Sequence, residues 1–289
     1  MNVRKPALPD ASLDDEQLAV ALGVGAGDVL QSLRAEVDAG DRELVGKDLR
    51  DAGDAASQEW LAAALRHARP DDAVLSEEAQ DGPSRLGADR VWIIDPLDGT
   101  REFAERHADG NPGEWRDDFA VHVALWERGR GLTAGSVALP ARGRVFSTAA
   151  TVHDRPGDAA ADAVVDGRRP LRIAASRSRP PRFVSALAER PDVELVPMGS
   201  AGVKVVSVVD GTVDAYVHGG GQFEWDSAAP VAVAQAAGLV CTRLDGTPLE
   251  YNREDPWLPD LFVCHPALVP HLRAALAEVG VDSKEGAQP

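Results

Sequence analysis

The stretch Val91–Thr100 constrains the chain most, because a run of apolar residues is followed at once by Asp-Pro-Leu-Asp-Gly-Thr. The run Val91–Ile94 is continuous rather than alternating, which predicts a strand that is covered on both faces. Asp95 would lie at the carboxyl end of this strand. Pro96 has no N–H to donate to a neighbouring strand, so strand pairing is expected to end there. The stretch therefore predicts a buried strand that leads directly into a polar turn.

The two acids of this turn suit a divalent cation. Gly99 permits a tight backbone that brings the Asp98 carboxylate beside that of Asp95, and two carboxylates so close repel each other. A hard ion such as Mg²⁺ removes this repulsion and prefers oxygen ligands. Thr100 is expected to open a helical turn that faces the same space. The alternative is an ordinary solvated turn, because Asp, Pro and Gly are the commonest turn residues.

Acids elsewhere in the chain favour the metal-site interpretation. Glu77 and Glu78 follow a short apolar run, and Asp226 stands after Trp225 at the start of an alanine-rich stretch. With Asp54 and the Asp-Pro-Leu-Asp-Gly-Thr turn, these pieces resemble the inositol monophosphatase superfamily of Mg²⁺-dependent, lithium-sensitive phosphatases. The family pattern is an acid, Glu-Glu, Asp-Pro-(Ile/Leu)-Asp-Gly-(Ser/Thr) and Trp-Asp, followed by Gly-Gly. The last pair departs from it, since this chain has Gly238-Leu239.

The resemblance implies a fold between the α+β and α/β classes, a layered αβαβα sandwich of the sugar-phosphatase type. It also implies hydrolysis of a phosphate monoester with two or three Mg²⁺ ions per site. One ion would be held by Glu77, Asp95 and the Leu97 carbonyl, and another by Asp95, Asp98 and Asp226, while Glu77 also contacts a weaker third ion. In the implied catalytic roles, Thr100 paired with Asp54 takes the proton of the attacking water, because a threonine alone is too weak a base.

Three features of the second half resemble the CysQ-type 3′-phosphoadenosine 5′-phosphate phosphatases of sulfur assimilation. They are Ser176-Arg177-Ser178, the stretch Gly199–Lys204 and the glycine-rich stretch His218–Glu224. The resemblance implies removal of the 3′-phosphate from this nucleotide, and from its 5′-phosphosulfate form, by a 3′(2′),5′-bisphosphate nucleotidase. The residues expected to contact the substrate are Asp98, Gly99, Thr100, Arg177, Ser200, Lys204 and Asp226.

Other functions stay open at this point. Within the family, the substrate could instead be inositol 1-phosphate or fructose 1,6-bisphosphate. A protein of another class would bind metal or nucleotide without catalysis, but a decayed enzyme would be expected to have lost one of its acids, and all are present. Members of the family are often dimers, and no exposed apolar stripe in the sequence decides whether this chain forms a homodimer.

Composition excludes several classes of partner. The formal net charge of −17 argues against a nucleic-acid-binding surface and against adhesion to anionic membranes. No run approaches the ~18 apolar residues of a membrane span, and Met1–Ser12 lacks the apolar core of a signal peptide, so a cytoplasmic location is expected. Cys241 and Cys264 lie in apolar, strand-like runs and are expected to be buried free thiols.

The remaining pattern predicts two units, residues 1–150 and 151–289. In the first, Ser12 is expected to cap a packing helix, and the polar segment 39–51 is expected to connect it to a second helix with Asp54 near its first turn. Three strands, 119–126, 132–139 and 144–147, are predicted as an antiparallel meander, on which His122 is expected to support a site or the core rather than bind metal. Residues 151–169 are expected to form the boundary, with alternating strands and helices beyond it and a disordered tail after Gly280.

Overall fold

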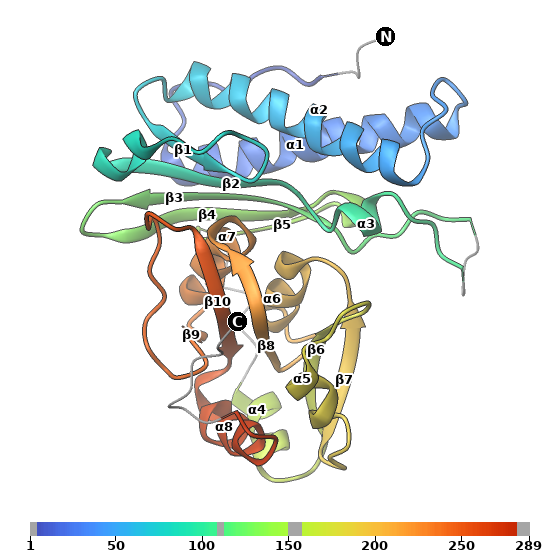
Figure 1. Cartoon of the computed structure of the whole chain (residues 1–289), viewed down its shortest axis with the longest axis vertical. Helices are drawn as coiled ribbons and strands as arrows, with labels where there is room; N and C mark the ends of the chain where they lie inside the picture. The colour runs from blue at the N-terminus through green and yellow to red at the C-terminus, as the bar shows by residue number, and fades with distance from the viewer. Residues whose placement is uncertain (1–4, 109–112, 150–157, 282–289) are drawn as a thin grey trace.

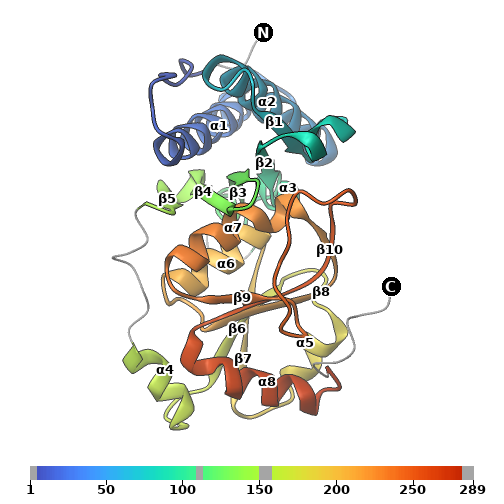
Figure 2. The same cartoon turned by 90° about the vertical axis from the view of Figure 1, so that its left-hand side faces the viewer.

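The computed structural model describes residues 5–108, 113–149 and 158–281. Its helices and strands form five layers, in which helices cover the outer faces of two sheets and a further helical layer lies between the sheets (Figure 1). The view turned by 90° shows the same sequence of layers (Figure 2). The predicted αβαβα sandwich is therefore confirmed.

The first outer layer consists of α1 (Asp15–Asp38) and α2 (Gly46–Ala68). Leu18, Leu22 and Leu30 of α1 are fully buried, as the helical spacing of apolar residues requires. The cap of α1 is Asp14 rather than Ser12. The Asp14 side chain accepts a hydrogen bond from Gln17 N, and the Gln17 side chain accepts one from Asp14 N, so the two residues form a capping box that Ser12 lies too early to make.

The connection between these helices is shorter than predicted. Because α2 begins at Gly46, the second part of the segment 39–51 is helical, and Asp54 lies well inside α2 rather than near its first turn. Residues 46–51 of α2 are strongly polar, and only Leu49 among them is buried. The sequence therefore lacks the apolar periodicity that would have predicted a helix there.

The first sheet has the order β1-β2-β3-β4-β5. It consists of β1 (Ala73–Ser76), β2 (Arg90–Asp98), β3 (Ala120–Glu127), β4 (Gly131–Leu139) and β5 (Arg144–Ser147), with the short helices η1 (Pro83–Gly87), α3 (Thr100–Phe103) and η2 (Pro140–Arg142) in its connections. β1 and β2 are parallel and the other pairs antiparallel, which confirms the predicted meander.

Strand pairing does not end at Pro96. In β2, Asp95 pairs with His122 and Asp98 pairs with Ala120, with a register shift between them. The shift places Pro96 in an irregularity where its missing N–H costs no ladder bond, and pairing resumes beyond it. The prediction of a strand buried on both faces is confirmed, because every residue from Val91 to Asp98 is buried.

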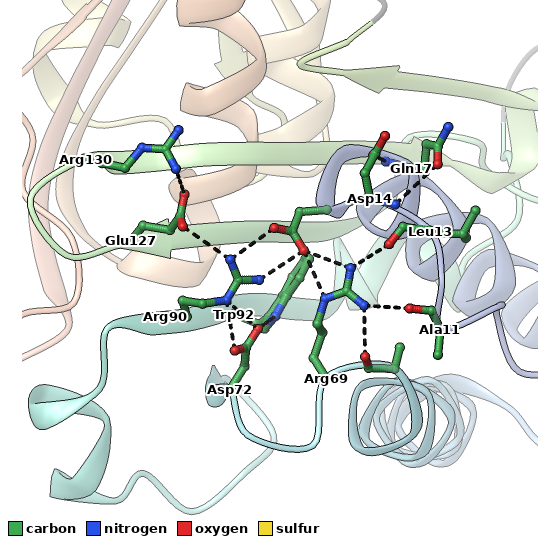
Figure 3. A network of polar contacts seen from close by, with 12 residues as sticks. Ala11, Leu13, Asp14, Gln17, Arg69, Asp72, Arg90, Trp92, Glu127 and Arg130 are labelled. Carbon is green, nitrogen blue, oxygen red and sulfur yellow. Dashed lines mark hydrogen bonds and ion pairs between the residues drawn. The ribbon is translucent and has the colours of Figure 1, made fainter.

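An arginine network ties the outer helices to the start of β2 (Figure 3). Arg90 binds Asp72, Asp15 and Glu127, with nitrogen–oxygen distances of 2.9 to 3.2 Å. Arg69 binds the same Asp15 carboxylate and donates to the carbonyl oxygens of Ala11 and Leu13. Asp15 at the start of α1 therefore holds both the end of α2 and the beginning of the central strand.

The second sheet has the order β7-β6-β8-β10-β9. It consists of β6 (Leu171–Ser176), β7 (Val193–Met198), β8 (Ala215–Phe223), β9 (Val240–Thr242) and β10 (Trp257–Cys264). The middle layer consists of α6 (Ala201–Val209) and α7 (Glu224–Ala236), and α7 packs on β4, β3 and β2 of the first sheet. The other outer layer holds α4 (Asp158–Val165), α5 (Arg182–Leu187), η4 (Pro266–Leu268) and α8 (Val269–Glu278).

Other expectations have mixed outcomes. Cys241 and Cys264 are buried free thiols, as predicted. The segment 151–169 contains α4 in its second part, while its first part, like the tail beyond residue 281, lies outside the described residues. In the part of the chain that the structure describes, no helix combines the length and the apolar character that crossing a bilayer requires.

Candidate active site

Four of the five predicted acids line one pocket of about 560 Å³, whereas Asp54 and the predicted substrate residue Arg177 do not line it. Its walls come from the end of β2, α3, the loop after β6, the start of α6, the strand β8 and the start of α7. The pocket thus lies where the middle layer meets both sheets. The residues predicted from sequence that line it are Glu77, Asp95, Leu97, Asp98, Gly99, Thr100, Ser200, Lys204 and Asp226.

Three carboxylates form a tight cluster in this pocket. Asp95, Asp98 and Asp226 each offer an oxygen that lies within 4.8 Å of the others. In each residue one oxygen is already fixed: Asp95 Oδ1 accepts from Leu97 N at 3.0 Å, and Asp226 Oδ2 accepts from Phe223 N at 2.6 Å. Asp98 Oδ2 accepts from Gly202 N at 2.7 Å and from the Ser200 hydroxyl. Such anchoring restricts the orientation of each carboxylate, as hydrogen bonds to metal-binding carboxylates do.

Asp98 is the most strongly supported of these acids. His122 Nε2 lies 3.2 Å from Asp98 Oδ2, and His122 Nδ1 lies 3.1 Å from the carbonyl oxygen of Trp225. A Cβ atom at position 202 would come within 2.0 Å of His122 Nε2, so only glycine lets α6 approach this closely. Burial acts to raise the pKa of Asp98, but His122, Lys204 and Ser200 outweigh it and hold the pKa at about 2.

The other acids lack such compensation. Burial, with repulsion from Glu77, Asp98 and Asp226, raises the pKa of Asp95 well above its usual value. Burial and Asp98 raise the pKa of Asp226 to about 6. Glu77 keeps contact with solvent, but partial burial and the neighbouring acids raise its pKa to about 7. A site that raises the pKa of several acids at once is a site that favours a bound cation.

Thr100 and Asp54 occupy neighbouring elements. Gly99, with φ of +89°, turns the chain from β2 into α3, so that Thr100 begins this helical turn as predicted. Asp54 on α2 has its pKa raised to about 7, first by burial and then by Glu78 and Asp51. Across the described residues, no hydrogen bond joins Thr100 to Asp54, so their predicted pairing stays a prediction. Ser57 on the same helix donates to the Pro96 carbonyl oxygen at 2.7 Å and so fixes the turn before Asp98.

Arg177 and Lys204, the cations predicted to bind the substrate, already interact with other groups of the protein. Arg177 donates to Glu102 at 2.9 Å and to Glu105 at 2.6 Å. Lys204 is 6% exposed, and its ammonium donates to the carbonyl oxygens of Gly199 and Ser200 at 3.3 and 2.5 Å. The roles of Arg177 and Lys204 in substrate binding stay predictions, because these contacts hold both cations within the protein.

His122 supports the cluster from β3, in agreement with its expected supporting role, although it does not line the pocket. Sequence reasoning missed two arginines that do line the pocket. Arg101 directly follows the Asp-Gly-Thr turn and Arg179 directly follows Ser176-Arg177-Ser178, and both line the pocket. Their adjacency to the motifs was the available signal.

Comparison with known proteins agrees with this geometry. Residues 14–277 match the inositol monophosphatase family. The 3′-phosphoadenosine 5′-phosphate phosphatase of Mycobacterium leprae (strain TN) is 45% identical over 280 residues, 93% of this chain and 96% of that protein. The protein of the same name from Mycobacterium bovis (strain ATCC BAA-935 / AF2122/97) is 47% identical over 279 residues, 94% of this chain and 98% of that protein.

The fold also has solved counterparts. The crystal structure of inositol monophosphatase II from Staphylococcus aureus MSSA476 superposes with a TM-score of 0.71 at 20% identity, covering 92% of this chain and 94% of that chain. At this identity the structural similarity shows only that the two proteins share a fold. Membership of the family is shown by the family match over residues 14–277. With its acid cluster at the position where a metal-dependent family needs one, the chain belongs to the inositol monophosphatase family.

Proposed function

We propose that the chain is a Mg²⁺-dependent phosphatase that converts 3′-phosphoadenosine 5′-phosphate to AMP and phosphate. The observation that carries the proposal is the cluster of Asp95, Asp98 and Asp226 in a pocket of nucleotide size. The names of the mycobacterial relatives support the choice of substrate. Activity on the 5′-phosphosulfate form, a cytoplasmic location and a homodimeric state are further expectations from the sequence.

The residues present fit a divalent cation. Each clustered carboxylate has one oxygen fixed by a donor of the protein, and hard oxygen ligands are those that Mg²⁺ prefers. In this proposal Glu77, Asp95 and the Leu97 carbonyl would hold one ion, and Asp95, Asp98 and Asp226 would hold a second. When bound, the ions would supply positive charge that neutralises the phosphate oxygens and makes a water easier to deprotonate.

In this proposal, side chains of the protein would accept the proton of the attacking water. Hydrolysis adds a water oxygen to phosphorus and breaks the bond to the 3′ oxygen, so one proton leaves the water and one reaches the departing hydroxyl. Thr100 lines the pocket, and the pKa of Asp54 is raised to about 7, which suits a base at neutral pH. We propose that Thr100 relays the proton of the water to Asp54 once substrate draws the two side chains together.

The test is phosphate release from 3′-phosphoadenosine 5′-phosphate, inositol 1-phosphate and fructose 1,6-bisphosphate, with Mg²⁺ and with a chelator. We expect kcat/KM to be at least ~100-fold higher for the nucleotide, about 2.7 kcal/mol of discrimination in the transition state. The matched control is Asp95→Asn, which removes one charge of the cluster and should abolish release while the protein stays folded. Preference for inositol 1-phosphate would overturn the substrate assignment, and no metal-dependent release from any of the three would overturn the enzyme itself.

A further inference from the structure

The pocket contains two arginines whose charge the protein does not neutralise. Arg101 on α3 and Arg179 in the loop after β6 both line the pocket and are exposed. Within the described ranges, neither guanidinium makes an ion pair or a hydrogen bond to another residue. In a chain with 47 acids and 30 lysines and arginines, two such cations that line one pocket need a physical explanation.

The acids that closely follow Arg101 in the chain already have a cationic partner. Glu102 and Glu105, which follow Arg101 in the chain, are both bound by Arg177. The third cation of this region, Lys204, donates to backbone carbonyls and lies next to Asp98. Arg177 and Lys204 therefore satisfy charges and carbonyls of the protein, while Arg101 and Arg179 are left for an anion from solution.

The amides at the start of α6 are also occupied. Gly202 N donates to Asp98 Oδ2, and Val203 N donates to the Ser200 hydroxyl oxygen. Binding of a second phosphate by these amides would therefore compete with the support of Asp98. An exposed guanidinium has no such conflict, and its planar donor fork matches a phosphate group well.

The two arginines come from different parts of the chain but share the pocket with the acid cluster. Arg101 follows Thr100, so it is held close to the cluster by α3, whereas Arg179 is placed by a turn in which Arg179 N donates to the Ser176 hydroxyl oxygen at 3.2 Å. A ligand with one phosphate at Asp95, Asp98 and Asp226 would place a second anionic group within the same 560 Å³.

We propose that Arg101 and Arg179 bind the non-reacting phosphate of the substrate, which is the 5′-phosphate of the nucleotide. The inference rests on the proposed function and extends it, because it makes these two residues the source of the preference for a bisphosphate over a monophosphate. Arg177 then acts within the protein, where it keeps Glu102 and Glu105 from neutralising Arg101.

The experiment separates this inference from the function on which it rests. AMP carries only the non-reacting phosphate and adenosine carries none, so calorimetric binding of both reports the subsite without hydrolysis. We expect Arg101→Gln and Arg179→Gln each to weaken AMP binding by about 10- to 100-fold, as loss of a charged hydrogen bond implies, with a much smaller effect on adenosine. In turnover, KM should rise at least ~10-fold more for 3′-phosphoadenosine 5′-phosphate than for 3′-AMP.

Matched controls use other arginines of the chain. Arg66→Gln alters an exposed arginine of α2 that makes no ion pair among the described residues, and it should change neither ligand's affinity. If wild type fails to bind AMP, or if AMP binding survives in both pocket variants and falls instead in Arg177→Gln, the inference is wrong. If AMP binding falls as expected but the nucleotide is not hydrolysed, the proposed function fails and the anion subsite stands.

Discussion

A single residue, Asp98, shows how the site compensates charge. Its carboxylate accepts hydrogen bonds from a backbone amide and a hydroxyl and lies next to His122. These interactions lower its pKa to about 2. Asp95 and Asp226 each accept a hydrogen bond from one backbone amide, and their pKa values are raised. In the metal-free site the carboxylates therefore repel one another. This repulsion determines whether the stability of the metal-free protein rises or falls with pH.

Stability of the metal-free protein should fall between about pH 4 and pH 7. Because the pKa values of Asp95 and Asp226 are raised, the folded state binds protons more tightly than the unfolded chain over this range, and each proton lost as pH rises costs stability. For Asp226, with a pKa of about 6, we expect a loss of about 1–2 kcal/mol. Urea denaturation in a chelator at about pH 5 and pH 7.5 measures it.

Excess Mg²⁺ should restore more stability at the higher pH, since carboxylates must be deprotonated to bind metal. Asp226→Asn provides the control, because it removes one titrating group and should reduce the slope with pH. Equal slopes in the wild type and this variant would contradict the assignment of the repulsion to the cluster.

The sequence identified the acids and a supporting role for His122, but not the contacts of Ser200 and Gly202 with Asp98. Asp95, Asp98 and Asp226 stand in local motifs whose chemistry can be read directly. Ser200 and Gly202 contact Asp98 across more than a hundred positions of the chain, and no local pattern encodes such a contact. The same limit applies to Arg177 and Lys204. The sequence shows their positive charge, but it does not show the glutamates that pair with Arg177 or the carbonyl oxygens that bind Lys204.

At the scale of elements, a buried network joins the loop that carries Glu77 to the helix that carries Asp226. Arg85 of η1 binds Asp81 at 2.7 Å and Asn252 Oδ1 at 2.8 Å. Asn252 N and Arg253 N in turn donate to the two oxygens of Glu224 at 2.6 and 2.8 Å. Glu224 is the first residue of α7 and is 1% exposed. The network therefore fixes the start of α7, two residues before Asp226.

Glu224→Gln should weaken metal binding although Glu224 does not face the cluster. A glutamine can accept only one of the two amide hydrogen bonds and would point its own N–H₂ at the other, which should cost about 1–3 kcal/mol of stability. Loosening the start of α7 should also lower Mg²⁺ affinity, which calorimetry measures. Glu250→Gln, an exposed change in the neighbouring loop, is the control. Unchanged stability with unchanged Mg²⁺ affinity would show that the network does not position Asp226.

At the scale of the whole molecule, the two proposed units share a core. Leu75, Val91 and Ile93 of the first sheet belong to one apolar cluster with Val203 of α6 and Val231 of α7. The position near residue 150 stays a proposal for the boundary, supported by the separation of the two sheets along the chain. The antiparallel meander of strands 119–126, 132–139 and 144–147 could be predicted from periodicity and turn residues. The order of the second sheet and the packing of α6 and α7 between the two sheets could not, because an apolar strand or helix face does not specify which element it packs against.

Neither unit should therefore fold alone. Residues 1–150 would expose the face of the first sheet that α7 covers, and residues 151–289 would expose α6 and α7, so each fragment loses apolar burial worth ~25 cal/mol per Å². We expect each fragment to lack a cooperative thermal transition by circular dichroism. Co-expression of the two should restore a cooperative transition and phosphatase activity, because Asp95 and Asp98 come from one fragment and Asp226 from the other. A cooperative transition in residues 1–150 alone would mean that the first sheet is stable without α7, and that the shared core is an interface between independent domains.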